Sequence, residues 1–311
     1  MLSLLLVSFL PSWGQIPTPD EYLGYPLGSQ FSRHHQIVGY FETVASQSPK
    51  VQLLPYGQTN EGRPLVVAVM TSESNMANLE QIRQSNLSAT GMQEVSAGEK
   101  RLPIVWLSYN IHGNEASASE AALKTLYEFA THDTANWLDN VVLIIDPCIN
   151  PDGRDRYVNW YRQASNLQPN VRPESWEHIE PWPGGRVNHY LFDLNRDWCW
   201  QSQVESYQRA QLYHQWMPQV HVDYHEQMPD APYFFGPAAE PMHKVITPWQ
   251  RKFQEYIGRN HAKYFDQNGW LYFTREIFDL LYPSYGDTWP TFQGAIGFTY
   301  EQGGHGRAGR A

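Results

Sequence analysis

The spacing of apolar residues changes repeatedly along the chain. Residues 29–48 place apolar side chains such as Ile37, Phe41 and Val44 three or four positions apart, which predicts an amphipathic helix. Short apolar runs such as 65–70 instead predict buried strands. The same patterns predict strands also at 51–56, 102–110, 141–146, 218–224 and 294–301, and helices also at 78–84, 116–130, 201–216 and 247–266.

Strands and helices therefore alternate along most of the chain. This alternation predicts an α/β fold with a central, mostly parallel mixed β-sheet and helices on both faces. Residues 163–192 interrupt the pattern with Pro, Gly and Trp, and we expect them to form an irregular surface or active-site insertion. Ligands of such sheets bind beyond the carboxyl ends of the strands, so polar residues that follow predicted strands are the first candidates for a functional site.

Composition narrows the class of protein. A hydrophobic share of 41% in 311 residues is ample for one large core. The net charge of −10, without a run rich in Lys or Arg, argues against a nucleic-acid-binding surface. The two cysteines, Cys148 and Cys199, allow either one disulfide or two small buried thiols.

The sequences of both chain ends also allow predictions. Residues 1–15 resemble the end of a secretory signal, although a basic n-region is missing and a buried strand or misassigned start is the alternative. This apolar stretch is too short to span a bilayer, and we expect a secreted or periplasmic protein. Residues 16–28 are then a leader and 29–311 a single domain. A covering helix is expected after Glu301, so we predict truncation at the C-terminus.

A histidine and a glutamate stand at one predicted strand end. His112 and Glu115 follow the run 102–110 and open the helix 116–130. An imidazole and a carboxylate at a strand-to-helix turn can converge on one divalent ion, and a catalytic zinc site needs a third protein ligand and an open position. The pair alone also fits a helix N-terminus at which Glu115 favours the positive end of the dipole.

Three later segments supply matching candidates. His225 follows a predicted strand and is a candidate third ligand; His221, on the same face, competes, although a core histidine is its commoner role. Asn195 and Arg196 place an amide beside a guanidinium, which either binds a carboxylate or holds a loop. Glu301 ends the last predicted strand, where a carboxylate serves as a general base near a metal or is merely solvated.

In this order the motifs resemble those of the zinc metallocarboxypeptidases similar to carboxypeptidase A. The resemblance covers about residues 30–303. It implies one zinc ion per chain, with His112, Glu115 and His225 as ligands. His225 matches the third ligand because the aromatic-Gly segment 233–236 follows it at the family's spacing.

The resemblance also implies roles around the metal. Arg162 matches the arginine that polarises the scissile carbonyl and steadies its oxyanion. Asn195 and Arg196 match the pair that grips the substrate's terminal carboxylate, and Glu301 matches the general base. The implied activity is hydrolysis of C-terminal amino acids from peptides that carry a free C-terminal carboxylate.

Some positions depart from the family's pattern. Asn114 stands between the first two ligands, so one subsite arginine is absent. Strict spacing puts Asp279 at the place of the mobile tyrosine; Tyr282 and Tyr285 are the nearby candidates, and Tyr285 is preferred. Gly286 falls at the position that sets side-chain preference. Because glycine carries no charge, we do not expect specificity for basic residues.

Two other functions fit the same residues. A zinc amidase or deacylase of the same fold would act on cell-wall peptides or on N-acyl amino acids, which also carry a free carboxylate. A non-catalytic binding module would keep the fold without the reaction. The intact predicted ligands and the predicted base argue against the binding module.

Overall fold

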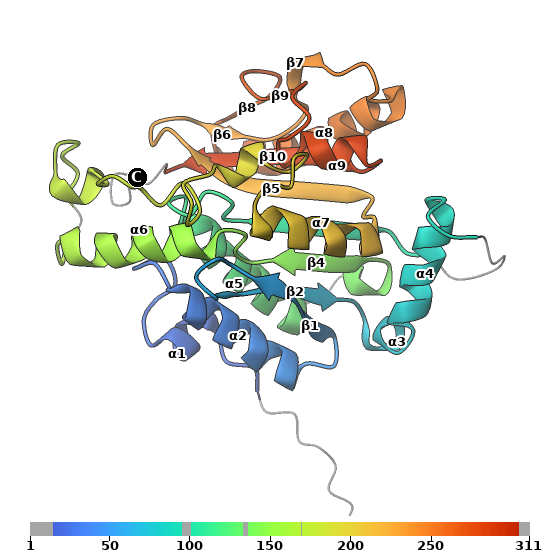
Figure 1. Ribbon diagram of the computed structural model, residues 1–311, viewed down its shortest axis with the longest axis horizontal. Helices are drawn as coiled ribbons and strands as arrows, with labels where there is room; N and C mark the ends of the chain where they lie inside the picture. Colours follow the sequence, from blue (N-terminus) through green and yellow to red (C-terminus); the bar gives the residue numbers. More distant parts are fainter. Residues whose placement is uncertain (1–14, 95–100, 133–135, 169, 305–311) are drawn as a thin grey trace, which may run out of the picture.

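The computed structural model describes residues 15–94, 101–132, 136–168 and 170–304, which are built around an eight-stranded sheet (Figure 1). The strand order is β1-β2-β4-β3-β5-β10-β6-β8, and β7 and β9 form a separate pair. The bounds are β1 (Val51–Gln58), β2 (Pro64–Met70), β3 (Ile104–Tyr109), β4 (Val142–Asp146), β5 (Val220–Gln227), β6 (Tyr233–Phe234), β7 (Ala239–Met242), β8 (Tyr272–Phe273), β9 (Asp279–Leu280) and β10 (Ile296–Gly303). The central strands β4, β3, β5 and β10 are parallel, whereas β1 with β2, β2 with β4 and β6 with β10 pair antiparallel.

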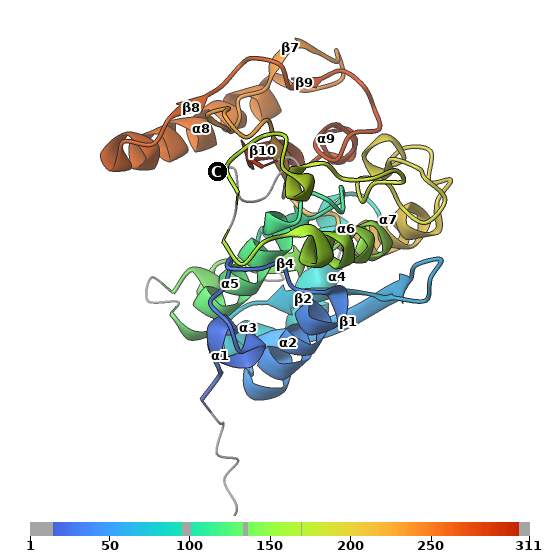
Figure 2. The same ribbon diagram turned by 90° about the vertical axis from the view of Figure 1, so that its left-hand side faces the viewer.

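Helices cover both faces of the sheet (Figures 1 and 2). They are α1 (Pro19–Leu23), α2 (His34–Gln47), α3 (Glu73–Met76), α4 (Leu79–Ala89), α5 (Ser117–Thr131), α6 (Pro151–Ala164), α7 (Val204–Trp216), α8 (Pro248–Asn268) and α9 (Thr288–Phe292), with 3₁₀ turns η1 (Trp137–Asp139), η2 (Trp176–His178) and η3 (Leu194–Arg196). One apolar cluster joins α2, α5 and part of α8 to one face. A second cluster joins α4, α7 and α9 to the other face.

The central strands are buried on both faces, which explains their continuous apolar sequences. In β3, Leu107 and Tyr109 belong to the first cluster, whereas Ile104 and Trp106 belong to the second. Alternate side chains of a strand point to opposite faces, so both sets must be apolar. The predicted α/β fold with a mixed central sheet is confirmed.

Four helices in the described residues were not predicted, namely the short α1, α3 and α9 and the longer α6. The helix α6 lies between the predicted strand 141–146 and the predicted irregular stretch 163–192, where no helix was expected, and its last two residues overlap that stretch. Its start carries a clear signal, because the Asn150 side chain accepts a hydrogen bond from the Gly153 amide at 3.0 Å and Pro151 follows at the first helical position. From this start, α6 extends away to one side of the sheet (Figure 1).

The structure describes only part of the two chain ends for which predictions were made. The predicted leader, 16–28, contains the short helix α1, whereas the signal-like residues before position 15 and the end from 305 onward lie outside the described residues. No helix within the described residues has the length and apolar character needed to cross a bilayer. Both thiols are free, so the disulfide alternative is wrong, and the alternative of two buried thiols holds only for Cys148, because Cys199 is exposed.

Candidate active site

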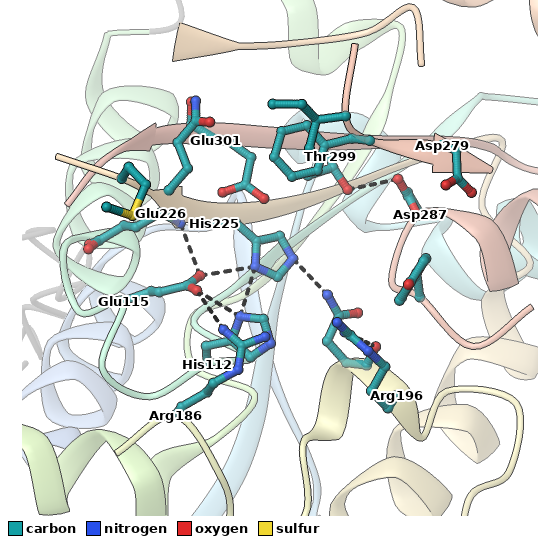
Figure 3. Close-up of a pocket in the computed structure, with 16 residues that line it drawn as sticks. His112, Glu115, Arg186, Arg196, His225, Glu226, Asp279, Asp287, Thr299 and Glu301 are labelled. Atoms are coloured by element: carbon teal, nitrogen blue, oxygen red, sulfur yellow. Dashed lines mark hydrogen bonds and ion pairs between the residues drawn. The ribbon is translucent and has the colours of Figure 1, made fainter. Parts of the chain in front are cut away.

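Three of the predicted ligands converge at the carboxyl ends of β3 and β5. The Nδ1 atom of His112 lies 2.8 Å from Oε1 of Glu115, and Nδ1 of His225 lies 3.0 Å from Oε2 of Glu115. The two Nδ1 atoms are 3.2 Å apart. All three side chains are buried, and Figure 3 shows them pointing toward one another.

The turn that carries the first two ligands is held by backbone geometry. Asn110 takes a left-handed conformation with φ of 60°, and its side-chain amide donates to the carbonyls of His112 at 2.7 Å and Glu115 at 3.0 Å. Gly113 packs directly on α6, because a Cβ there would lie 2.2 Å from the Arg154 amide nitrogen. The turn therefore holds an imidazole and a carboxylate against the end of β5.

The donor set fits a zinc ion. A tetrahedral zinc ion with bonds of about 2.0–2.1 Å keeps its ligand atoms about 3.3 Å apart. The two Nδ1 atoms are 3.2 Å apart, and each lies 2.8 or 3.0 Å from one of the two Glu115 oxygens, which is close to this value. Two imidazole nitrogens and one carboxylate oxygen also leave the fourth position open, as catalytic zinc sites do.

Each histidine has a carboxylate at its outer nitrogen. Asp193 Oδ1 lies 3.1 Å from Nε2 of His112, and Asp223 Oδ2 lies 2.8 Å from Nε2 of His225. An Nε2–H that donates to a carboxylate leaves the Nδ1 lone pair free to bind a metal. Neither aspartate was predicted, although each stands two residues from a predicted site residue.

His221 is a core histidine, as its sequence context favoured. Its ring is fully buried and packs against Trp106 and Trp198. Burial lowers the pKa of His221 to about 3, because the imidazolium form is poorly solvated there. It is not part of the ligand cluster.

Glu301 lies in β10 directly beside His225 in the sheet register. It is 7% exposed, and its Oε2 atom has no hydrogen-bond partner among the described residues. Burial raises the pKa of Glu301 to about 8; His225 opposes this shift and Glu115 adds to it. Figure 3 shows its carboxylate above the His225 ring. Such a carboxylate is well placed to accept a proton.

A pocket opens over the ligand cluster (Figure 3). Its lining includes the cluster, Glu301 and twelve further residues, namely Arg186, Asn195, Arg196, Glu226, Gln227, Met228, Ile277, Phe278, Asp279, Tyr285, Asp287 and Thr299. Arg186 and Arg196 approach from the side opposite Glu301. The pocket thus sets two guanidinium groups across the ligand cluster from an acid.

The structure places Arg162 elsewhere, so its predicted role must be corrected. Arg162 lies in the last turn of α6 and donates to Oε1 of Gln30 at 2.6 Å. Eleven residues of helix separate it from the start of α6 at the site, about 16 Å at 1.5 Å per residue. The pocket instead contains Arg186, whose Nη1 lies 3.4 Å from Oε1 of Glu115.

Asn195 and Arg196 lie together at the pocket, in η3. The Gly286 amide donates to Oδ1 of Asn195 at 2.7 Å, which fixes the orientation of this side-chain amide. Its Nδ2 atom then lies 3.2 Å from Nε2 of His225. The guanidinium of Arg196 stacks over the Tyr285 ring at 4.6 Å.

The remaining predicted positions separate into two groups. Tyr285 and Asp279 line the pocket, whereas the Tyr282 hydroxyl accepts a hydrogen bond from the Trp200 indole at 3.0 Å outside that lining. Gly286 does not form the pocket wall either, because a Cβ there would lie 1.9 Å from Oδ2 of Asp223. Its predicted role in side-chain preference is therefore replaced by close packing.

Other acids and amides complete the surroundings. Asp287 lies at the pocket, and burial raises its pKa to about 6 against hydrogen bonds from Thr299 and Thr288. Asn114 donates to the Glu180 carboxylate at 2.9 Å and lies outside the lining. Asp287, the residue after Gly286, thus adds a carboxylate to the pocket lining, and the family's spacing did not predict it.

The fold and this site define an α/β protein with a candidate metal centre at the carboxyl ends of parallel strands. A family model described as zinc carboxypeptidase matches residues 37–255, which is more than half of the chain. The chain belongs to the zinc carboxypeptidase family. The predicted resemblance and zinc dependence are thereby confirmed.

Three solved structures share this fold at low sequence identity. A metallo-carboxypeptidase from Burkholderia cenocepacia is 18% identical with a TM-score of 0.57, and the match covers 88% of this chain and 60% of that one. A carboxypeptidase A from Helicoverpa armigera is 16% identical with a TM-score of 0.58, covering 88% and 64%. Bovine thrombin-activatable fibrinolysis inhibitor is 15% identical with a TM-score of 0.58, covering 88% and 86%. The chain thus spans about three fifths of the length of the first two, and these likenesses show the fold alone.

Proposed function

We propose that this protein is a zinc metallocarboxypeptidase that hydrolyses the last peptide bond of peptides with a free C-terminal carboxylate. The observation that carries the proposal is the content of one pocket. Two imidazoles and a carboxylate converge there, and two guanidinium groups lie opposite. A buried carboxylate lies beside the cluster, and its Oε2 atom has no hydrogen-bond partner in the part of the chain that the structure describes.

Glu301 is the proposed proton carrier. When bound, zinc supplies Lewis-acid polarisation of the substrate carbonyl and of the attacking water. Glu301 takes the proton of that water and delivers it to the leaving amine. Burial, which raises the pKa of Glu301 to about 8, makes its carboxylate a stronger base, and a cation held by the three ligands opposes part of this shift.

The guanidinium and amide groups bind and orient the substrate. Arg186 donates to the carbonyl oxygen as negative charge develops on it, in the role first expected of Arg162. Asn195 Nδ2 and the Arg196 guanidinium hold the terminal carboxylate. Because they demand a carboxylate one residue beyond the cut bond, the reaction removes single residues from the C-terminus.

A panel of substrates tests this function. The zinc-loaded chain is assayed on one peptide with a free C-terminus, on the same peptide as its C-terminal amide, on an N-acyl amino acid and on a cell-wall peptide. We expect cleavage of the free-carboxylate peptide, loss of cleavage on amidation, and loss on zinc chelation with recovery on zinc addition. The variant Glu301→Gln should keep zinc and lose about 10²–10⁴-fold in turnover.

Specific outcomes would contradict the proposal. Equal cleavage of the amidated peptide would remove the role of Asn195 and Arg196 as a carboxylate clamp. Hydrolysis of the N-acyl amino acid or cell-wall peptide alone would assign the site to an amidase instead. Full activity of Glu301→Gln would refute its role as base.

We also propose that the protein acts outside the cytoplasm. The support is the signal-like composition of residues 1–15 alone. Fractionation of cells expressing the full chain should recover a shortened protein outside the cytoplasm. A full-length protein confined to the cytoplasm would contradict this.

A further inference from the structure

Asp223 lies directly behind the metal cluster, on the same face of β5 as His225. Side chains two residues apart in a strand point to the same side, so the carboxylate and the imidazole are neighbours. Oδ2 of Asp223 lies 2.8 Å from Nε2 of His225, and Asp223 has no exposed surface.

The contact determines which nitrogen of His225 binds a metal. Nδ1 of His225 lies in the ligand cluster, 3.0 Å from Glu115. With Nε2–H donating to Asp223, the proton is held on the outer nitrogen and the lone pair remains on Nδ1. The same contact fixes the rotation of the ring, because both ring nitrogens are then engaged.

The packing around Asp223 leaves it little freedom to move. Gly286 lies against it so closely that a Cβ would come within 1.9 Å of Oδ2 and 3.0 Å of the Trp198 indole nitrogen. The amide of the same glycine donates to Asn195. Since Nε2–H of His225 donates to Asp223, Nδ2 of Asn195 finds no acceptor on that ring and stays available to a bound carboxylate.

Asp223 lies in a row of polar residues that crosses the sheet. In the sheet register Asp223 stands beside Ser108 on one side and Thr299 on the other, and Ser108 stands beside Asp146. Arg209 of α7 is fully buried, stacks over the Trp198 ring at 3.7 Å and attracts both Asp223 and Asp146 electrostatically. This cation offsets part of the cost of burying a carboxylate.

We propose that Asp223 is a positioning residue for the metal centre: it holds His225 in the tautomer and orientation that place Nδ1 in the cluster. The inference rests on the proposed function only in taking His225 as a zinc ligand. It makes metal affinity, rather than turnover, the property that Asp223 controls most directly.

The test measures the zinc dissociation constant of the full chain by competition with a chromophoric chelator. Asp223→Ala removes the acceptor, whereas Asp223→Asn keeps an amide oxygen that can accept from Nε2–H. Asp146→Asn is the matched control, because Asp146 is equally buried in the same row but accepts from the Tyr56 hydroxyl at 3.0 Å. Circular dichroism and thermal unfolding of each metal-free variant check the fold.

We expect Asp223→Ala to weaken zinc binding about 10- to 100-fold, Asp223→Asn to weaken it less, and Asp146→Asn to leave it unchanged. A folded Asp223→Ala variant with the wild-type zinc constant would overturn the proposal. Equal weakening by Asp146→Asn would also overturn it, because the effect would then belong to the buried row in general.

Two further experimental outcomes also decide between the proposals. If Asp223→Ala does not fold, Asp223→Asn decides: weakened zinc binding beside an unchanged Asp146→Asn supports the proposal, and a wild-type constant overturns it. A wild-type chain that binds zinc but cleaves no peptide would refute the proposed function alone, and the zinc constants would still decide the role of Asp223.

Discussion

Replacing Arg186 with alanine tests which arginine stabilises the substrate carbonyl oxygen: Arg186, which lines the pocket, or Arg162, which was expected from the sequence. Arg186 lines the pocket next to Glu115, whereas Arg162 lies in the last turn of α6 and contacts Gln30. If a guanidinium steadies the carbonyl oxygen of the substrate, Arg186→Ala should lower kcat and Arg162→Ala should not. The two variants remove the same chemical group and are therefore matched.

The expected size of the effect follows from the setting of Arg186. Removing one donor from an oxyanion site costs about 10²–10³-fold in kcat. The Arg186 side chain is 34% exposed, so water screens part of its charge and we expect the lower end, about 100-fold. Arg162→Ala, a substitution away from the site, should change kcat by no more than about twofold.

Steady-state kinetics on the free-carboxylate peptide give this result, with zinc content measured in the same samples. The zinc measurement is needed because Nη2 of Arg186 pairs at 3.0 Å with Asp193, which in turn contacts His112. A variant that keeps zinc and loses kcat supports the assigned role. Normal kcat in Arg186→Ala, or a large loss in Arg162→Ala, would refute the reasoning.

Three other substitutions give further checks. Because burial raises the pKa of Glu301 to about 8 from 4.5, folded metal-free protein binds more protons than unfolded protein between these values and loses stability as pH rises. Glu301→Gln should therefore gain stability over wild type as pH rises through this window, and an unchanging difference in chemical unfolding would contradict it. Gly286→Ala should destabilise the fold by about 1–3 kcal/mol by overpacking against Asp223, and wild-type thermal stability would argue against the close contact. Arg154→Met should cost about 3–5 kcal/mol by leaving Glu120 buried without its 2.6 Å partner, and urea unfolding would show a neutral effect if the pair were unimportant.

The cluster of His112, Glu115 and His225, which could hold a metal ion, was predictable from the sequence because these positions depend on local rules. His112 and Glu115 follow β3, His225 lies near the end of β5, and parallel strands end at the same edge of a sheet. Glu301 obeys the same rule in β10, next to β5. Strand pairing alone was therefore enough to bring distant residues together.

The positions that were wrong depend on tertiary contacts instead. Residues 163–192 have no hydrophobic period, and their path is set by contacts such as those of Arg156 with the carbonyls of Gly184 and Asn188. Those contacts return the chain to the pocket and bring Arg186 with it. The Asn150-Pro signal for α6 was present in the sequence and would have moved Arg162 away from the site.

The sequence spacing from Glu301 also selected the wrong residue for the pocket wall. Counting back from Glu301 selects Gly286, but the structure turns Asp287 toward the pocket and packs Gly286 on Asp223. A shift of one residue in a loop exchanges the side chain that faces a ligand for one that faces the core. Sequence offsets between elements do not resolve such a shift.

The central claim is that one zinc ion binds His112, Glu115 and His225 together. Diffraction from crystals of the zinc-loaded chain, recorded at the zinc absorption edge, tests this directly. The account predicts a single anomalous peak within about 2.0–2.2 Å of both Nδ1 atoms and of a Glu115 oxygen. A zinc ion bound elsewhere, or bound through Nε2 of either histidine, would contradict it.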